Sequence, residues 1–106
     1  MRKNGKILWV VYYVDEDDPS RDRQYLFETA EIVCYELFRG KIEQFLGVPI
    51  IDITYYREQR MPNVVVDDDI SMALAMDFFT MQAIQTGRTR KAKFIATYQK
   101  FSSFKY

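Results

Sequence analysis

The absence of histidine is the first constraint on what this chain can do, because imidazole is the side chain that most active sites use near neutral pH. Without it, Ser-His and Cys-His nucleophilic pairs cannot form, and most transition-metal sites lose a common ligand. Carboxylates are present in two short runs, residues 15–18 and 67–69. They could share a Mg²⁺ ion, but each run is also what a solvated turn or helix start requires. We therefore predict a protein that is not an enzyme, with no catalytic residue, cofactor or metal site.

The C-terminal segment, residues 87–106, has a different chemistry, because it combines Lys and Arg with aromatic residues and contains no acid. Cations that meet phosphates and rings that stack on bases are what single-stranded nucleic acid binding needs. The residues predicted to contact nucleic acid are Arg88, Arg90, Lys91, Lys93, Tyr98 and Lys100. Arg2, Lys3 and Lys6 are expected to join them, where the chain's beginning meets the end of the last strand. Alternatively, Phe94 and Tyr98 belong to the core, and the cations neutralise an acidic turn beside the last strand's start.

A third candidate surface lies in residues 70–86, where apolar side chains recur at helical spacing on two opposite faces. One face is sufficient to pack on a sheet and consists of Met72, Ala75, Met76, Phe79 and Ala83. The other face carries the predicted partner-binding residues, Ile70, Leu74, Phe78 and Met81. A small domain has little material with which to bury both faces, and adaptable Met side chains suit a contact surface. The alternative is that the first helix or residues 101–104 fold over the second face.

Composition indicates the class of the protein. Its fifteen basic and fifteen acidic residues cancel, so net charge favours neither a nucleic acid nor a membrane as partner. Eight Tyr, eight Phe and one Trp exclude a disordered chain. The single Cys34 cannot form an internal disulfide, and the apolar run 7–14 is too short for a membrane span and lacks a signal cleavage site. We expect a cytoplasmic protein with no membrane partner.

The elements that must position these residues begin with a strand. Residues 7–14 are apolar or aromatic throughout, which is typical of a central strand. Asp18 stands where an N-cap is expected and Pro19 at a first helical position, so a helix is predicted to begin near Pro19. Apolar residues at helical spacing between 24 and 46 predict a long amphipathic helix that ends at Gly47 and Pro49.

Two strands joined by a turn are predicted next. Residues 50–57 alternate, with Ile51, Ile53 and Tyr55 on one face, and residues 63–66 resume the strand after a turn at 58–62. The acidic run 67–69 supplies an N-cap for a helix over 70–86, which Gly87 ends. Alternating residues over 91–101 predict the last strand.

This order of elements, βαββαβ, predicts an α+β fold of the ferredoxin-like type over residues 1–106. Such a fold has one antiparallel four-stranded sheet with two helices on one face. The first strand is expected to be central, with strands 50–57 and 91–101 at the edges. The strands before the two acidic runs would then end at opposite edges of the sheet, so one ion could not bridge the runs.

These observations favour a non-enzymatic interaction or regulatory protein that acts by protein–protein binding. The expected partner is a second copy of the chain or another protein, through the helix face or the unpaired sheet edges. The alternative is a single-stranded nucleic-acid-binding protein that uses the basic, aromatic C-terminal segment. Small size and the lack of a catalytic signature are also typical of accessory proteins of viruses and mobile elements.

Overall fold

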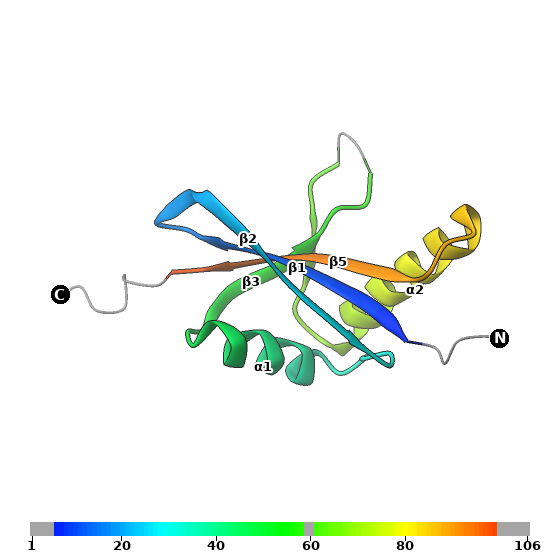
Figure 1. Ribbon diagram of the computed structural model, residues 1–106, viewed down its shortest axis with the longest axis horizontal. Coiled ribbons are helices and arrows are strands. Elements are labelled where there is room, and N and C mark those ends of the chain that lie inside the picture. Colours follow the sequence, from blue (N-terminus) through cyan, green and yellow to red (C-terminus); the bar gives the residue numbers. More distant parts are fainter. Residues whose placement is uncertain (1–5, 59–60, 100–106) are drawn as a thin grey trace.

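The computed structural model describes residues 6–58 and 61–99, which form five strands and two helices. In chain order they are β1 (Ile7–Asp15), β2 (Asp18–Thr29), α1 (Tyr35–Leu46), β3 (Ile50–Tyr55), β4 (Val64–Val66), α2 (Asp69–Thr86) and β5 (Lys91–Tyr98). The strands make one mixed sheet with the order β2-β1-β5-β3-β4 (Figure 1). β1 and β5 are parallel, and the other neighbouring pairs are antiparallel. The predicted ferredoxin-like fold with four antiparallel strands is therefore wrong.

The error lies in residues 18–29, which form strand β2 instead of the start of a helix. Asp15 pairs with Asp18 across a tight turn, and the backbone N–H of Asp17 donates to the Asp15 carboxylate at 2.9 Å. The side chains that follow alternate with the period of a strand, with Tyr25 and Phe27 packed on the core and Leu26 exposed between them. Long-range pairing with β1 therefore overrides the local helix-start signal.

Helix α1 begins later than predicted, at Tyr35, and ends as predicted at Gly47, whose φ of 77° is left-handed. The N–H of Tyr35 donates to the Asp69 carboxylate at 2.8 Å, which joins the starts of the two helices. Glu43 accepts from Arg39 and from the backbone N–H of Ile50, both at 2.9 Å. These bonds hold α1 against the first residue of β3.

The core lies between one face of the sheet and both helices. Trp9, which is fully buried, has ring centroid distances of 5.7, 5.1 and 6.1 Å to Phe27 of β2, Phe38 of α1 and Phe94 of β5. Phe79 of α2 contacts the same Phe94 ring at 5.4 Å. Residues from both helices thus meet at the centre of the sheet. On either side of this centre, α1 covers the β1–β2 half and α2 covers the β3–β5 half (Figure 1).

The opposite sheet face carries the alternate residues of the strands. Leu8, Val10 and Tyr12 of β1 lie there, and Ile95 of β5 is the register partner of Tyr12. Within the described residues neither helix packs on this face, because the core residues of both contact the other side. We call it the open sheet face.

The predicted hairpin of residues 50–66 is confirmed as β3 and β4, but two details differ. The register is irregular between Ile50 and Asp52, so Ile50 and Ile53 are buried while Ile51 is exposed. β3 and β5 are interior strands, and the edges of the sheet are β2 and β4. The predicted edges at 50–57 and 91–101 are therefore wrong.

Candidate interaction surfaces

Helix α2 forms as predicted to within one residue, because its ends carry strong local signals. Asp68 caps the start: its carboxylate accepts from the backbone N–H of Ser71 at 2.8 Å, and the Ser71 hydroxyl accepts from the N–H of Asp68 at 3.1 Å. The Ser71 N–H and the Ser71 hydroxyl both donate to the Asp68 carboxylate, and these two hydrogen bonds lower the pKa of Asp68 below its ordinary value of 3.8. Gly87, with a φ of 67°, ends the helix. The helix is therefore a well-defined platform for the side chains on its outer side.

The inner face of α2 packs on the sheet through Met72, Ala75, Met76 and Phe79, all buried. The opposite side carries a row of apolar side chains that are open to solvent. Ile70 is 72% exposed, Leu74 59%, Met81 53% and Ile84 68%. We define the outer α2 stripe as these four residues together with half-buried Phe78. Sequence reasoning found four of the five and missed Ile84, although its position three residues after Met81 was an available signal.

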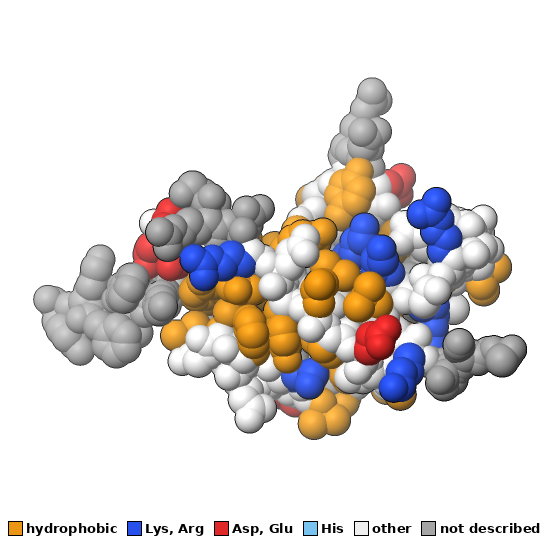
Figure 2. Space-filling view, in the orientation of Figure 1, with side chains coloured by type: hydrophobic (Ala, Val, Ile, Leu, Met, Phe, Trp, Pro, Cys, Tyr) orange, Lys and Arg blue, Asp and Glu red, His pale blue; other side chains and the backbone are white. Residues whose placement is uncertain are grey.

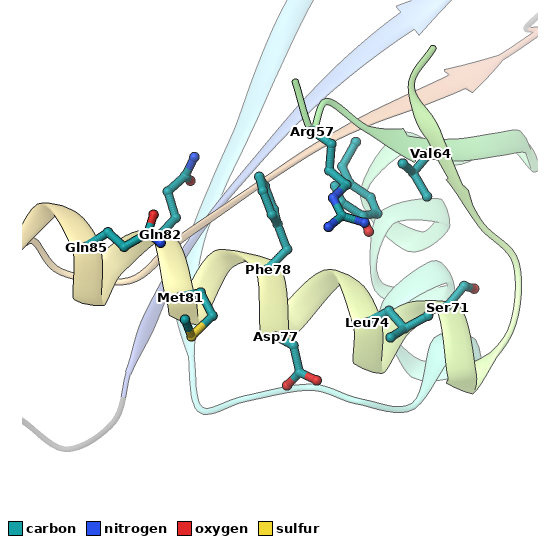
Figure 3. Close-up of a pocket in the computed structure, with 10 residues that line it drawn as sticks. Arg57, Val64, Ser71, Leu74, Asp77, Phe78, Met81, Gln82 and Gln85 are labelled. Atoms are coloured by element: carbon teal, nitrogen blue, oxygen red, sulfur yellow. The ribbon is translucent and has the colours of Figure 1, made fainter. Parts of the chain in front are cut away.

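A groove of about 620 Å³ runs beside this stripe, between α2 and the β3–β4 hairpin. Leu74, Phe78 and Met81 line it from the helix side. From the other side comes Arg57, whose guanidinium lies over the Phe78 ring at 5.5 Å from its centroid (Figure 3). The rings of Tyr55 and Phe78 pack with a centroid distance of 5.7 Å. Burial raises the pKa of the Tyr55 hydroxyl. Tyr55 and Arg57 reach the groove only through hairpin packing, so helical periodicity could not reveal them.

Two proposed coverings of the outer α2 stripe can be compared with the structure. The first was helix α1, which instead lies over β1 and β2, where Phe45 stacks on Tyr25 at a centroid distance of 3.9 Å. That alternative is wrong, and the stripe is left exposed by the described residues. The second covering, residues 101–104, lies outside the residues that the structure describes.

The predicted nucleic-acid-binding residues fall into separate places. Arg88, Lys91 and Lys93 line a second groove of about 430 Å³ between the last turns of α2 and the start of β5. We call it the cationic groove. Arg90 points elsewhere, with its guanidinium 3.4 Å from the Glu31 carboxylate and 3.4 Å from the Thr80 hydroxyl.

The aromatic residues predicted for the same site do not join the cationic groove. Phe94 is fully buried in the core, and Tyr98 lies at the far end of β5, at a ring centroid distance of 6.3 Å from Tyr13. Lys100, Arg2 and Lys3 lie outside the described residues. Seven residues separate Lys91 from Tyr98, about 23 Å along the strand. A continuous strip of cations and stacking rings is therefore not present along the described part of β5.

The acidic turn of residues 15–18 lies beside the end of β5, not beside its start. The backbone N–H of Glu16 donates to the carbonyl of Tyr98 at 2.7 Å, and Asp15 is the register partner of Tyr98. The chain's beginning meets the start of β5 instead, because Leu8 pairs with Lys91 in the parallel register. The alternative in which the cations neutralise this turn is therefore wrong for Arg88, Arg90, Lys91 and Lys93, while Lys100 and Lys105 lie outside the described residues. The expected meeting of the first residues with the last strand's end is wrong as well.

The two acidic runs also lie differently from the prediction. β1 and β4 point the same way, so both runs follow strand ends on one side of the sheet. β5 and β3 separate the two strands, a distance of about 14 Å. Among residues 6–58 and 61–99, no group of three or more Asp, Glu or Cys side chains is placed to hold a metal ion. Spacing across the sheet, and not opposite strand ends, keeps the runs apart.

Two general findings complete the description of these surfaces. In the part of the chain that the structure describes, no helix has the length and apolar character needed to cross a membrane. Comparison with known proteins adds no assignment, since the chain matches no protein-family model and no curated protein is significantly similar to it.

Proposed function

We propose that this protein acts by protein–protein binding and not by catalysis, and that the outer α2 stripe is its contact surface. The observation that carries the proposal is the exposure of Ile70, Leu74, Met81 and Ile84 in one row, each more than half open to solvent. Asp77 is the only charged side chain between Ile70 and Thr86. A helix with so few charges on its solvent side exposes an apolar surface of the kind that marks an interaction site.

We take a second copy of the chain as the partner. The positions 70, 74, 77, 81 and 84 are spaced by alternating steps of four and three residues, which is the spacing of a helix–helix seam. Two α2 helices that meet along this row would form an isologous contact, with the same stripe on both sides. Asp77 occupies the middle of the seam, so the Asp77 carboxylates of the two copies would lie near each other and need a cation between them.

The groove beside the stripe supports the same proposal. On the helix side Leu74, Phe78 and Met81 alternate with polar residues, while Arg57 supplies one cation from the other side. A copy whose α2 packs on the stripe brings its own Asp77 to this region, so that Arg57 and Asp77 of the two copies have opposite charges to pair. We place this binding protein in the cytoplasm, because its only cysteine, Cys34, is a free thiol in a helix-capping position.

The test is the molar mass in solution, measured by light scattering during size-exclusion chromatography over a range of protein concentrations. We expect a dimer for the wild type and a folded monomer for the double variant Leu74→Glu/Met81→Glu, because buried carboxylates in the contact cost more than the apolar contact returns. Phe78→Glu is a poorer choice, since Phe78 is half-buried against Tyr55 and Phe79.

The matched control is Leu37→Glu, which places the same charge at a leucine of α1 that is 69% exposed. This variant should keep the wild-type mass. A wild type that stays monomeric at every concentration would exclude the second copy as partner. A dimer that survives the double variant would exclude the outer α2 stripe as its contact.

A further inference from the structure

The cationic groove is a second surface that the protein-binding proposal does not use. In the described part of the chain, its lining includes Arg88, Lys91 and Lys93 and no carboxylate, and Thr86 and Thr89 add hydroxyl donors. Among the described residues, none of the three cations forms an ion pair within 4.0 Å, whereas the neighbouring Arg90 pairs with Glu31. Like charges gathered in one groove repel each other, so the arrangement costs stability unless an anion offsets it.

The fold explains why these cations gather there. Gly87 ends α2, and the N–H of Arg88 donates to the carbonyl of Ala83 at 3.1 Å, which turns Arg88 back along the helix. Lys91 and Lys93 are two residues apart on β5, so they emerge on the same side about 6.6 Å apart. The pairing of β5 with β3 runs from Tyr98 only to Ile95, which leaves this part of β5 with β1 as its one partner.

Several exposed cations lie at the end of the sheet where β1 and β5 begin. Lys6 is exposed just before β1 and belongs to the same end as Lys91, because Leu8 and Lys91 are register partners. The acidic residues of the β1–β2 turn lie at the other end, beside Tyr98. Figure 2 shows Lys and Arg side chains around the end where β1 and β5 begin, with an acidic side chain among them, and both acidic and basic side chains beside the β1–β2 turn. A net charge of zero is therefore compatible with a local group of cations at this end, although Glu28 and Glu31 lie there too.

We propose that the cationic groove binds the phosphate backbone of a single-stranded nucleic acid. Cations in a row along a strand suit a ligand with repeated negative charges better than a single phosphate group, which needs converging donors. The open sheet face next to Lys93 offers half-buried Ile95 and the Tyr12 ring, against which unpaired bases can pack. A duplex has its bases stacked internally, so only a single strand can use both surfaces.

The test is fluorescence anisotropy of a labelled single-stranded oligonucleotide titrated with the full chain. We expect saturable binding. The logarithm of the association constant should fall with the logarithm of the salt concentration with a slope of about −2, as three neutralised phosphates on a single strand predict. The triple variant Arg88→Gln/Lys91→Gln/Lys93→Gln should reduce affinity at low salt at least tenfold. The variant Arg21→Gln/Arg23→Gln/Lys41→Gln removes the same charge from β2 and α1 and should bind as the wild type does.

Two further binding measurements identify the ligand. Tyr12→Ala should weaken binding of the oligonucleotide about tenfold, the typical loss of one base-stacking contact, and leave its salt slope unchanged. Inorganic tripolyphosphate should compete only weakly. Equal losses in the two triple variants, tighter binding of a duplex than of a single strand, or binding of tripolyphosphate alone would each overturn the proposal. The residues changed in Leu74→Glu/Met81→Glu lie outside this groove. The effect of that variant on the molar mass therefore tests the dimer, and it does not test nucleic acid binding.

Discussion

At the residue scale, Trp9 shows how one side chain organises the centre of the protein. Its ring is fully buried among aromatic residues from two strands and one helix. Its indole N–H still has a partner, since it donates to the Thr29 hydroxyl at 2.9 Å. Because Thr29 is the last residue of β2, this bond ties the end of the β1–β2 hairpin to the core. The hydrogen bond that the buried indole N–H makes with Thr29 thus helps to hold residues 18–29 in a strand.

The first prediction concerns this bond. Thr29→Val keeps the shape of the side chain but leaves the indole N–H of Trp9 without its partner. We expect a loss of about 1–2 kcal/mol in the free energy of unfolding, the usual cost of an unpaired buried donor. Urea denaturation followed by Trp fluorescence measures it. Thr54→Val, a β3 substitution of the same kind, should change stability by less than about 0.5 kcal/mol; equal losses in both variants would mean that the bond contributes nothing specific.

At the scale of elements, local signals succeeded where they coincide with the ends of helices. Asp68 with Ser71 at the start of α2, Gly87 at its end and Gly47 at the end of α1 all act as predicted. Such caps work through hydrogen bonds within a few residues, so the sequence contains the whole interaction. The Asp18-Pro19 pair has the same local form and misled the prediction, because β2 pairs with β1 across separations that grow from 3 residues at Asp15–Asp18 to 22 at Ile7–Thr29.

The second prediction concerns the α2 cap. The pKa of Asp68 is lowered in the folded protein, so its carboxylate stabilises the fold above its ordinary pKa of 3.8, and this contribution is lost as pH falls through the lowered value. Asp68→Ala should therefore lower the melting temperature at pH 7. The difference from the wild type should shrink below about pH 4. Thermal unfolding by circular dichroism between pH 2.5 and 7 checks this, and a difference that does not depend on pH would argue against a charged cap.

At the scale of the whole molecule, the fold places one surface on the outer side of helix α2 and a different surface at the C-terminal end of the same helix. The outer α2 stripe is apolar and faces away from the sheet, while the cationic groove lies where α2 gives way to β5. The two are separate enough for each to be altered without the other. A dimer formed through the stripe would present two cationic grooves, one on each copy.

The third prediction follows from coupling between association and folding. If two copies bind through the outer α2 stripe, the dimer is favoured at higher concentration, and the melting temperature of the wild type should rise with protein concentration. Leu74→Glu/Met81→Glu should melt at a temperature that does not depend on concentration. Differential scanning calorimetry over a hundredfold range of concentration measures both. A wild-type melting temperature that stays constant would contradict the dimer independently of the mass measurement.

The sequence by itself determined which faces of α2 are apolar, where α2 begins and ends, and that residues 50–66 form a hairpin, because these features depend on neighbours within a few residues or on simple periodicity. The apolar face predicted for the first helix was wrong, since Leu37 and Phe45 are exposed and Phe38 and Ile42 are buried. It also identified Leu74, Phe78, Met81 and the three cations Arg88, Lys91 and Lys93 as candidates. Only the tertiary structure decided that residues 18–29 pair with β1, that β5 lies parallel to β1, and that the acidic turn sits far from those cations. Strand partners are chosen by the packing of the whole core, since a strand presents the same alternating pattern to any neighbour.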